Sequence, residues 1–77
     1  MKIIIADDEL IERKAMRKFI SESFNHIEVI GEAANGRVAI ELARKHKPDV
    51  MIMDIHMPGI DGLEAIRQIL VELPHTK

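Results

Sequence analysis

Two short apolar runs stand out in the chain, and each ends at an acidic residue. Residues 3–6 are continuous and mostly β-branched, and residues 50–53 form a second run of the same length. Runs this short and uninterrupted are typical of strands buried on both faces of a parallel sheet. Residues 27–32 alternate instead, which predicts a strand near a sheet edge. The pattern therefore predicts three strands.

Three further segments repeat their apolar residues every three or four positions, as amphipathic helices do. They are residues 9–24, residues 37–47 and a segment with apolar positions at Leu63, Ile66, Leu70 and Leu73. Asn35 and Gly36 supply a turn and a helix start before the second segment. Pro48 and Pro74 end the second and third helices, because proline cannot continue a helix.

Strands and helices thus alternate, which predicts an α/β fold whose parallel strands are joined by right-handed crossovers. Asp7 and Asp8 follow the first predicted strand, and Asp54 follows the third. If these two strands are neighbours, the sheet order is 2-1-3 and the three carboxylates meet at its carboxyl edge. Like charges held close there repel unless a divalent cation or protons neutralise them. We therefore expect the function at that edge.

Composition narrows the classes of function and of partner that the chain can have. The chain has 77 residues, which corresponds to one small domain or part of one, and its net charge of -2 includes no basic block. We expect no direct contact with nucleic acid by this segment. The chain has no cysteine for disulfides or zinc, and no apolar run approaches the length of a membrane span. We expect a cytoplasmic protein with no membrane partner.

In combination, these residues resemble the receiver domain of two-component response regulators. The resemblance rests on Asp7-Asp8, Asp54, the loop 57–62 with the sequence MPGIDG, and Asn35-Gly36. The residues of both acidic motifs are similar to those of bacterial regulators that carry an AraC-type DNA-binding domain. The resemblance implies a truncated flavodoxin-like three-layer fold with three helices. It also implies a role in regulating transcription that is not enzymatic.

The resemblance further implies that Asp54 is the phospho-acceptor, taking a phosphoryl group from the phosphohistidine of a sensor histidine kinase. It implies that Asp7 and Asp8 hold Mg²⁺ together with Asp54 and the backbone carbonyl of His56, with Asp8 the more direct ligand of the pair. The residue types agree with this chemistry. A carboxylate is ionised at neutral pH and attacks without a general base, and Mg²⁺ prefers hard oxygen ligands and retained waters.

Each signal also has a plainer interpretation. Asp8 could be the N-cap of the first helix, since aspartate is a favoured cap, and Asp54 alone could be a solvated loop acid. A phosphohydrolase of the aspartyl-phosphate type is disfavoured, because that class needs a second aspartate two residues after the nucleophile and this chain has His56 there. A module used only for assembly remains an alternative.

The resemblance also indicates what these residues lack. A complete receiver has two further strand–helix units, which bring a serine or threonine after the fourth strand and a lysine after the fifth. Residues 74–77 lie where the fourth strand would begin. We therefore expect residues 1–77 to be the N-terminal portion of a receiver, units 1 to 3, with impaired phosphotransfer and switching. We also expect the strand edge at residues 50–53 to produce a homodimer or a swapped oligomer.

Overall fold

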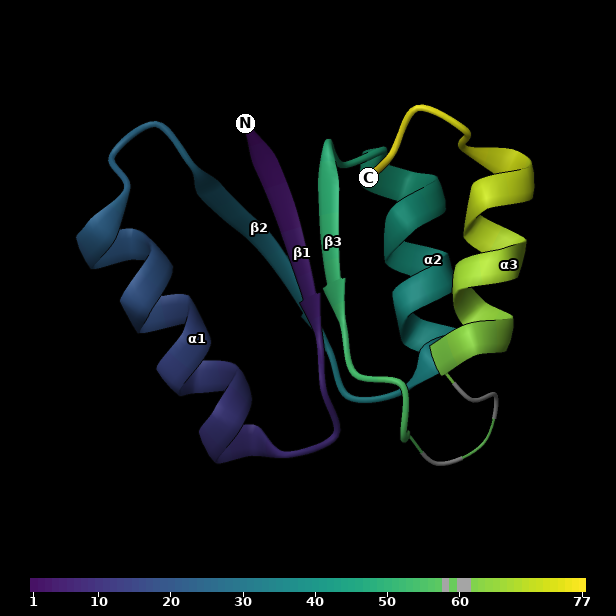
Figure 1. Cartoon of the computed structure of the whole chain (residues 1–77), viewed down its shortest axis with the longest axis horizontal. Helices are drawn as coiled ribbons and strands as arrows, with labels where there is room; N and C mark the ends of the chain where they lie inside the picture. The colour runs from purple at the N-terminus through teal and green to yellow at the C-terminus, as the bar shows by residue number, and fades with distance from the viewer. Residues whose placement is uncertain (58, 60–61) are drawn as a thin grey trace.

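The fold is a parallel sheet with helices on both faces. We describe residues 1–57, 59 and 62–77 of a computed structural model. In chain order the elements are β1 (Lys2–Ala6), α1 (Leu10–Ser23), β2 (Glu28–Ala33), α2 (Gly36–His46), β3 (Val50–Met53) and α3 (Gly62–Glu72). The sheet order is β2-β1-β3, and both pairings are parallel. Figure 1 shows α1 on one face of the sheet and α2 with α3 on the other. The predicted fold class, three layers and 2-1-3 order are confirmed.

The predicted boundaries hold to within about two residues, and local chemistry explains them. α2 begins after Asn35, whose Oδ1 accepts a hydrogen bond from the N–H of Val38 at 2.9 Å. It ends at Lys47, which adopts the left-handed conformation with φ of 48°. The N-cap of α1 is Glu9, and it makes no side-chain capping bond. The interpretation of Asp8 as this cap is therefore wrong.

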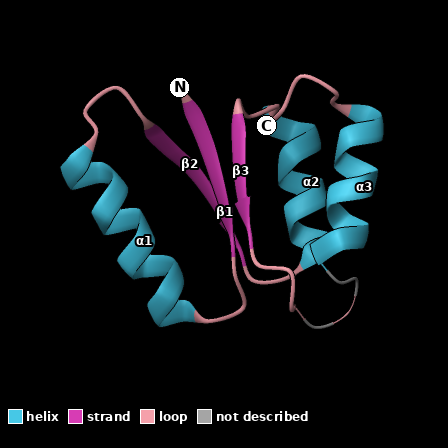
Figure 2. Cartoon of the chain, viewed as in Figure 1, coloured by secondary structure: helices cyan, strands magenta, loops and turns pink. Residues whose placement is uncertain are grey.

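The helices and strands of the described residues are short, and Figure 2 shows the helices in cyan and the strands in magenta. In the described part of the chain, no helix combines the length and the apolar content needed to cross a membrane. Part of the predicted loop 57–62, namely residues 58, 60 and 61, lies outside the described residues.

β1 lies at the centre of the core, which explains its uninterrupted apolar run. Ile3, Ile4, Ile5 and Ala6 are each at most 5% exposed. Ile3 and Ile5 pack with Ile20 of α1 on one face of the sheet, and Ala6 packs toward α2 on the other. A strand with both faces covered has no position for a polar residue until it ends. The first position beyond it is therefore where a carboxylate can lie.

The carboxylate of Glu32 on β2 binds α1 to the sheet. Glu32, whose side chain is 10% exposed, pairs with three cations of α1: Arg13 Nε at 3.2 Å, Lys14 Nζ at 3.0 Å and Arg17 Nη1 at 2.5 Å. Their hydrogen bonds, led by that of Arg17, lower the pKa of Glu32 to about 2. Ionised Glu32 is thus the common partner that holds one face of α1 against β2.

The outer edge of β3 carries the first bonds of a further parallel pairing. The N–H of Lys77 donates to the carbonyl of Asp49 at 2.9 Å, and the N–H of Met51 donates to the carbonyl of Lys77 at 3.0 Å. In a parallel sheet, a residue pairs with the neighbouring strand by donating to one of its residues and accepting from the residue two positions further along. The buried hydroxyl of Thr76 donates to the carbonyl of Pro48 at 2.8 Å and holds the segment in place. This edge therefore accepts a parallel strand.

Gly62 brings the start of α3 against the backbone that follows β3. Its N–H donates to the carbonyl of Ile55 at 2.8 Å. A Cβ added at Gly62 would overlap the carbonyl oxygen of Asp54 and would lie 2.6 Å from Cα of Ile55. Backbone atoms cannot move aside as the tip of a side chain can, so the contact requires glycine.

We predict that Glu32→Gln lowers the free energy of unfolding by roughly 2 kcal/mol at pH 7, because it removes the carboxylate that three cations share. The folded pKa is depressed from 4.5 to about 2, so the stabilisation is present above pH 4.5 and is lost as the pH falls toward 2. Urea denaturation across this pH range measures the difference between the two proteins.

Glu22→Gln is the matched control, because Glu22 pairs with Lys18 at 4.0 Å on an exposed helix face. Pairs of this kind contribute little to stability. A Glu32→Gln effect equal to that of the control, or one that does not change between pH 5 and pH 2, would contradict the interpretation of Glu32 as an ionised anchor.

We predict that Gly62→Ala destabilises the fold by about 3 kcal/mol, because a methyl group would overlap backbone atoms. Gly31→Ala serves as the control. Its added Cβ would meet only side-chain atoms, the nearest being Cδ1 of Leu42 at 3.4 Å. Thermal unfolding of both variants compares the two sites, and a Gly62→Ala protein as stable as Gly31→Ala would show that the turn after β3 adapts.

Candidate metal and phosphoryl site

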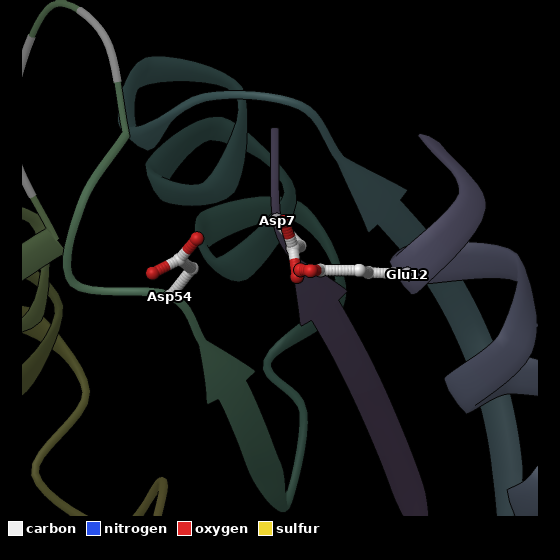
Figure 3. A group of neighbouring side chains, drawn as sticks. All are labelled: Asp7, Glu12 and Asp54. Carbon is white, nitrogen blue, oxygen red and sulfur yellow. The ribbon is translucent and has the colours of Figure 1, made fainter. Parts of the chain in front are cut away.

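Three carboxylates from separate elements converge at the carboxyl edge of the sheet. Asp7 follows β1, Asp54 follows β3, and Glu12 lies in the first turn of α1. One oxygen from each lies within 4.8 Å of the others. Figure 3 shows Glu12 reaching from its helix to Asp7, with Asp54 on the neighbouring strand end. Asp7 is buried, Asp54 is half-buried and Glu12 is exposed, so the group opens to solvent.

Asp7 is fixed through its backbone and its side chain. Its N–H donates to the carbonyl of Ala33 at the end of β2, at 2.9 Å. Its own carbonyl accepts from Nη1 of Arg13, also at 2.9 Å. Its Oδ1 accepts from the N–H of Glu9 at 2.9 Å, which turns the chain into α1. The direction of the carboxylate is therefore set by β2 and α1 together.

Asp54 is placed by the pairing of β1 with β3. Ala6 lies opposite Met53, the last residue of β3, and the N–H of Asp54 donates to the carbonyl of Ala6 at 2.8 Å. Asp7 and Asp54 are thus the first residues beyond one pair of neighbouring strand ends. Oδ1 of Asp54 accepts from the N–H of His56 at 3.0 Å, which orients the carboxylate within its own loop.

The negative charge of the neighbouring carboxylates affects the pKa of Glu12. A hydrogen bond with Asp7 and the charge of that carboxylate raise the pKa of Glu12 above its usual value of 4.5, with smaller effects from burial, Glu9 and Asp54. A hydrogen bond between two carboxyl groups requires a proton on one of them. The group therefore favours a bound positive charge, which a proton or a cation can supply.

A cavity of about 260 Å³ lies beside these carboxylates, on the α1 face of the sheet. It is lined by Ile5, Ala6, Asp7, Glu12, Met16, Ile52, Met53 and Asp54. The lining thus combines apolar side chains with acids that open to solvent. An anion alone would be repelled here, whereas a cation, or an anion accompanied by a cation, is suited to the site.

The donor set fits Mg²⁺. Octahedral Mg²⁺ holds oxygen ligands at about 2.1 Å, so opposite ligands are about 4.2 Å apart. Neighbouring ligands are about 3.0 Å apart, and the three carboxylate oxygens, which lie within 4.8 Å of one another, can reach these spacings by rotation of their side chains. Because Mg²⁺ retains several waters, a site open to solvent is also appropriate.

The four predicted metal-site residues do not all enter this group. Asp7 and Asp54 are brought together as the sheet order predicts. Asp8 is exposed and, among the described residues, lies outside the group of three. His56 is also exposed, and its backbone N–H orients Asp54.

The sequence interpretation missed Glu12, which the structure adds. The available signal was an acid in the first turn of a helix that begins directly after Asp7-Asp8. Because the first turn of such a helix starts beside the strand end, an acid there can face the same edge.

Comparison with known proteins agrees with this arrangement. The family model described as response regulator receiver domain matches residues 3–77. The chain is 43% identical over 76 residues to the uncharacterized transcriptional regulatory protein YhcZ of Bacillus subtilis, covering 99% of this chain and 35% of that protein. It is 46% identical over 74 residues to a protein-glutamate methylesterase/protein-glutamine glutaminase of Hahella chejuensis, covering 96% of this chain and 21% of that enzyme.

Among solved structures, the REC domain of AraT, a response regulator from Geobacillus stearothermophilus, superimposes with a TM-score of 0.89 at 40% identity. The match covers 96% of this chain and 57% of that domain chain. The chain thus spans about a third or less of the two curated relatives named above. The methylesterase is similar only over this receiver region, so its enzymatic activity is not carried over to this chain. Since the family model covers residues 3–77, the chain belongs to the response regulator receiver domain family.

Proposed function

We propose that Asp54 is the phospho-acceptor of this receiver and that a sensor histidine kinase is its donor. The observation that carries the proposal is the placement of the Asp54 carboxylate, held by the N–H of His56 at the rim of the cavity and facing Asp7. In the transfer, a carboxylate oxygen of Asp54 forms a bond to phosphorus while the bond from phosphorus to the histidine nitrogen breaks. A carboxylate nucleophile of this kind needs no general base.

We propose that Asp7, Asp8, Asp54 and the backbone carbonyl of His56 hold Mg²⁺, the cofactor typical of receivers. Asp8 adjoins Asp7 on the same loop. A bound Mg²⁺ would neutralise the carboxylates and the oxygens of the incoming phosphoryl group. The protein's own part is to hold the ligands at two strand ends and to leave the cavity open for the phosphoryl group.

The wider role is proposed from the relatives. YhcZ is named a transcriptional regulatory protein, which supports regulation of transcription through another part of a longer protein. We propose no direct contact between this segment and DNA, because its net charge is -2. We propose a cytoplasmic location. The AraC-type output domain stays a prediction, since the relatives also include a methylesterase.

We predict that acetyl phosphate with Mg²⁺ adds a phosphoryl group to these residues only slowly, in line with the impaired phosphotransfer expected from the sequence, and that Asp54→Asn abolishes the addition. Asparagine keeps the shape of the side chain but cannot form the acyl phosphate. Intact-mass spectrometry at successive times measures the modification, and hydroxylamine should remove it because it cleaves acyl phosphates.

The matched control is Glu41→Gln, which removes one negative charge from an exposed position on α2 that pairs with Arg37. It should be labelled as the unmodified chain is. Labelling that persists in Asp54→Asn would assign the acceptor elsewhere, and labelling lost in both variants would point to a general effect of charge.

A second candidate function is assembly through the edge of β3. Lys77 begins a parallel pairing on this edge. Beside it, an apolar cavity of about 310 Å³ lies between β3 and α3, lined mainly by Met51, Met53, Ile66, Ile69 and Leu70. A strand added to β3 would cover this cavity as it completes the pairing. We propose that a second copy supplies the cover, as a homodimer or a swapped oligomer.

We predict that the weight-average mass of the chain rises with concentration and that the rise does not require Mg²⁺. Sedimentation equilibrium at several micromolar concentrations, with and without Mg²⁺, measures both points. Met51→Lys places a charge in the cavity lining and should shift the equilibrium toward monomer. A monomer at all concentrations with a sharp thermal transition would contradict the assembly role.

A further inference from the structure

We infer that Arg13 is a positioning residue for the metal-binding acids, holding Asp7 through its backbone carbonyl while Glu32 holds Arg13. The inference rests on the proposed Mg²⁺ site, because its consequence is the direction in which Asp7 presents its carboxylate. Arg13 acts through Asp7 and is not proposed as a ligand of the metal.

One guanidinium joins three parts of the fold. Nη1 of Arg13 donates to the carbonyl of Asp7 at 2.9 Å, and its Nε donates to Oε1 of Glu32 at 3.2 Å. Only 13% of the Arg13 side chain and 10% of the Glu32 side chain are exposed. The planar, rigid guanidinium thus links the end of β1, the body of β2 and the first turns of α1.

The hydrogen bond from Arg13 matters because it fixes the second of the two peptide groups that flank Asp7. The N–H of Asp7 is bound to the carbonyl of Ala33, and its carbonyl is bound to Arg13. With both flanking peptide groups fixed, the backbone of Asp7 cannot rotate, and its Oδ1 remains on the N–H of Glu9. Without Arg13, the peptide between Asp7 and Asp8 loses one of its anchors.

The neighbouring cations on α1 provide an internal comparison. Lys14 and Arg17 also bind Glu32, but their side chains are 59% and 46% exposed. The second hydrogen bond of Arg17 goes to the carbonyl of Val29, at 3.4 Å, away from the acids. Among the described hydrogen bonds of these three cations, only those of Arg13 reach the loop that carries Asp7.

Charge and position act in opposite directions on metal binding, which makes the test decisive. Removing a positive charge near a cation site strengthens cation binding by reducing repulsion. Removing a partner that orients a ligand residue weakens metal binding, commonly by 10- to 100-fold for such supporting contacts. The sign of the change therefore distinguishes the two effects.

The experiment measures the Mg²⁺ dissociation constant of the unmodified chain, Arg13→Gln and Arg17→Gln by calorimetry, at a temperature where all three are folded. We expect Arg13→Gln to bind Mg²⁺ about tenfold more weakly. We expect Arg17→Gln to bind as tightly as the unmodified chain or slightly more tightly. The backbone amide resonance of Glu9, which reports the bond to Asp7, should shift in Arg13→Gln and stay in place in Arg17→Gln.

Arg13→Lys is the second variant if Arg13→Gln does not fold. It keeps the charge beside Glu32, but a single ammonium cannot reproduce the two-sided fork, so Mg²⁺ binding should again be weaker and the Glu9 amide should again shift. Equal Mg²⁺ affinity in the Arg13 and Arg17 variants would overturn the inference. If the unmodified chain binds no Mg²⁺, the proposed metal site fails, and the Glu9 amide still decides whether Arg13 positions Asp7.

Discussion

The site depends on one constraint, the parallel pairing of β1 with a neighbour on each side. Ala6 lies opposite Ala33 on β2 and opposite Met53 on β3, so all three strands end together. The next residues of β1 and β3 are Asp7 and Asp54, and their backbone N–H groups continue the pairing onto Ala33 and Ala6. The hydrogen bonds of the sheet thus bring two carboxylates together that would separate in solution. Because the fold holds two carboxylates close together against their repulsion, a bound cation would stabilise the folded chain.

The parts of this arrangement that depend on local sequence could be predicted. The uninterrupted apolar run of β1 reports burial on both faces, and the alternation of β2 reports an edge. The acids after two such runs predict the sheet order, because neighbouring strands place them side by side at the carboxyl edge. The start of α2 could also be predicted, since Asn35 is a favoured cap, and its side chain accepts a hydrogen bond from the N–H of Val38 in the first turn.

The remaining features depend on side chains that are distant in sequence, and no local pattern reveals them. In the sequence, Glu32 looks like an ordinary polar residue of an edge strand. In the structure it forms ion pairs with three cations of α1, because the helix crosses β2 beside it. Arg13 reads as one of several basic residues on a solvated helix face. Its separate role follows from the rotation of α1, which turns Arg13 inward and leaves Lys14 and Arg17 half-exposed. Glu12 enters the acidic group for the same reason.

The central claim is that the carboxylates at this edge form a site for a divalent cation. The most direct test is the free energy of unfolding, measured with urea at increasing Mg²⁺ concentration and constant ionic strength. A ligand that binds only the folded chain stabilises it by about 1.4 kcal/mol for each tenfold increase above its dissociation constant. We expect this rise in the unmodified chain and a smaller rise in Asp54→Asn. A free energy of unfolding that does not depend on Mg²⁺, or one that rises equally in both proteins, would contradict the claim.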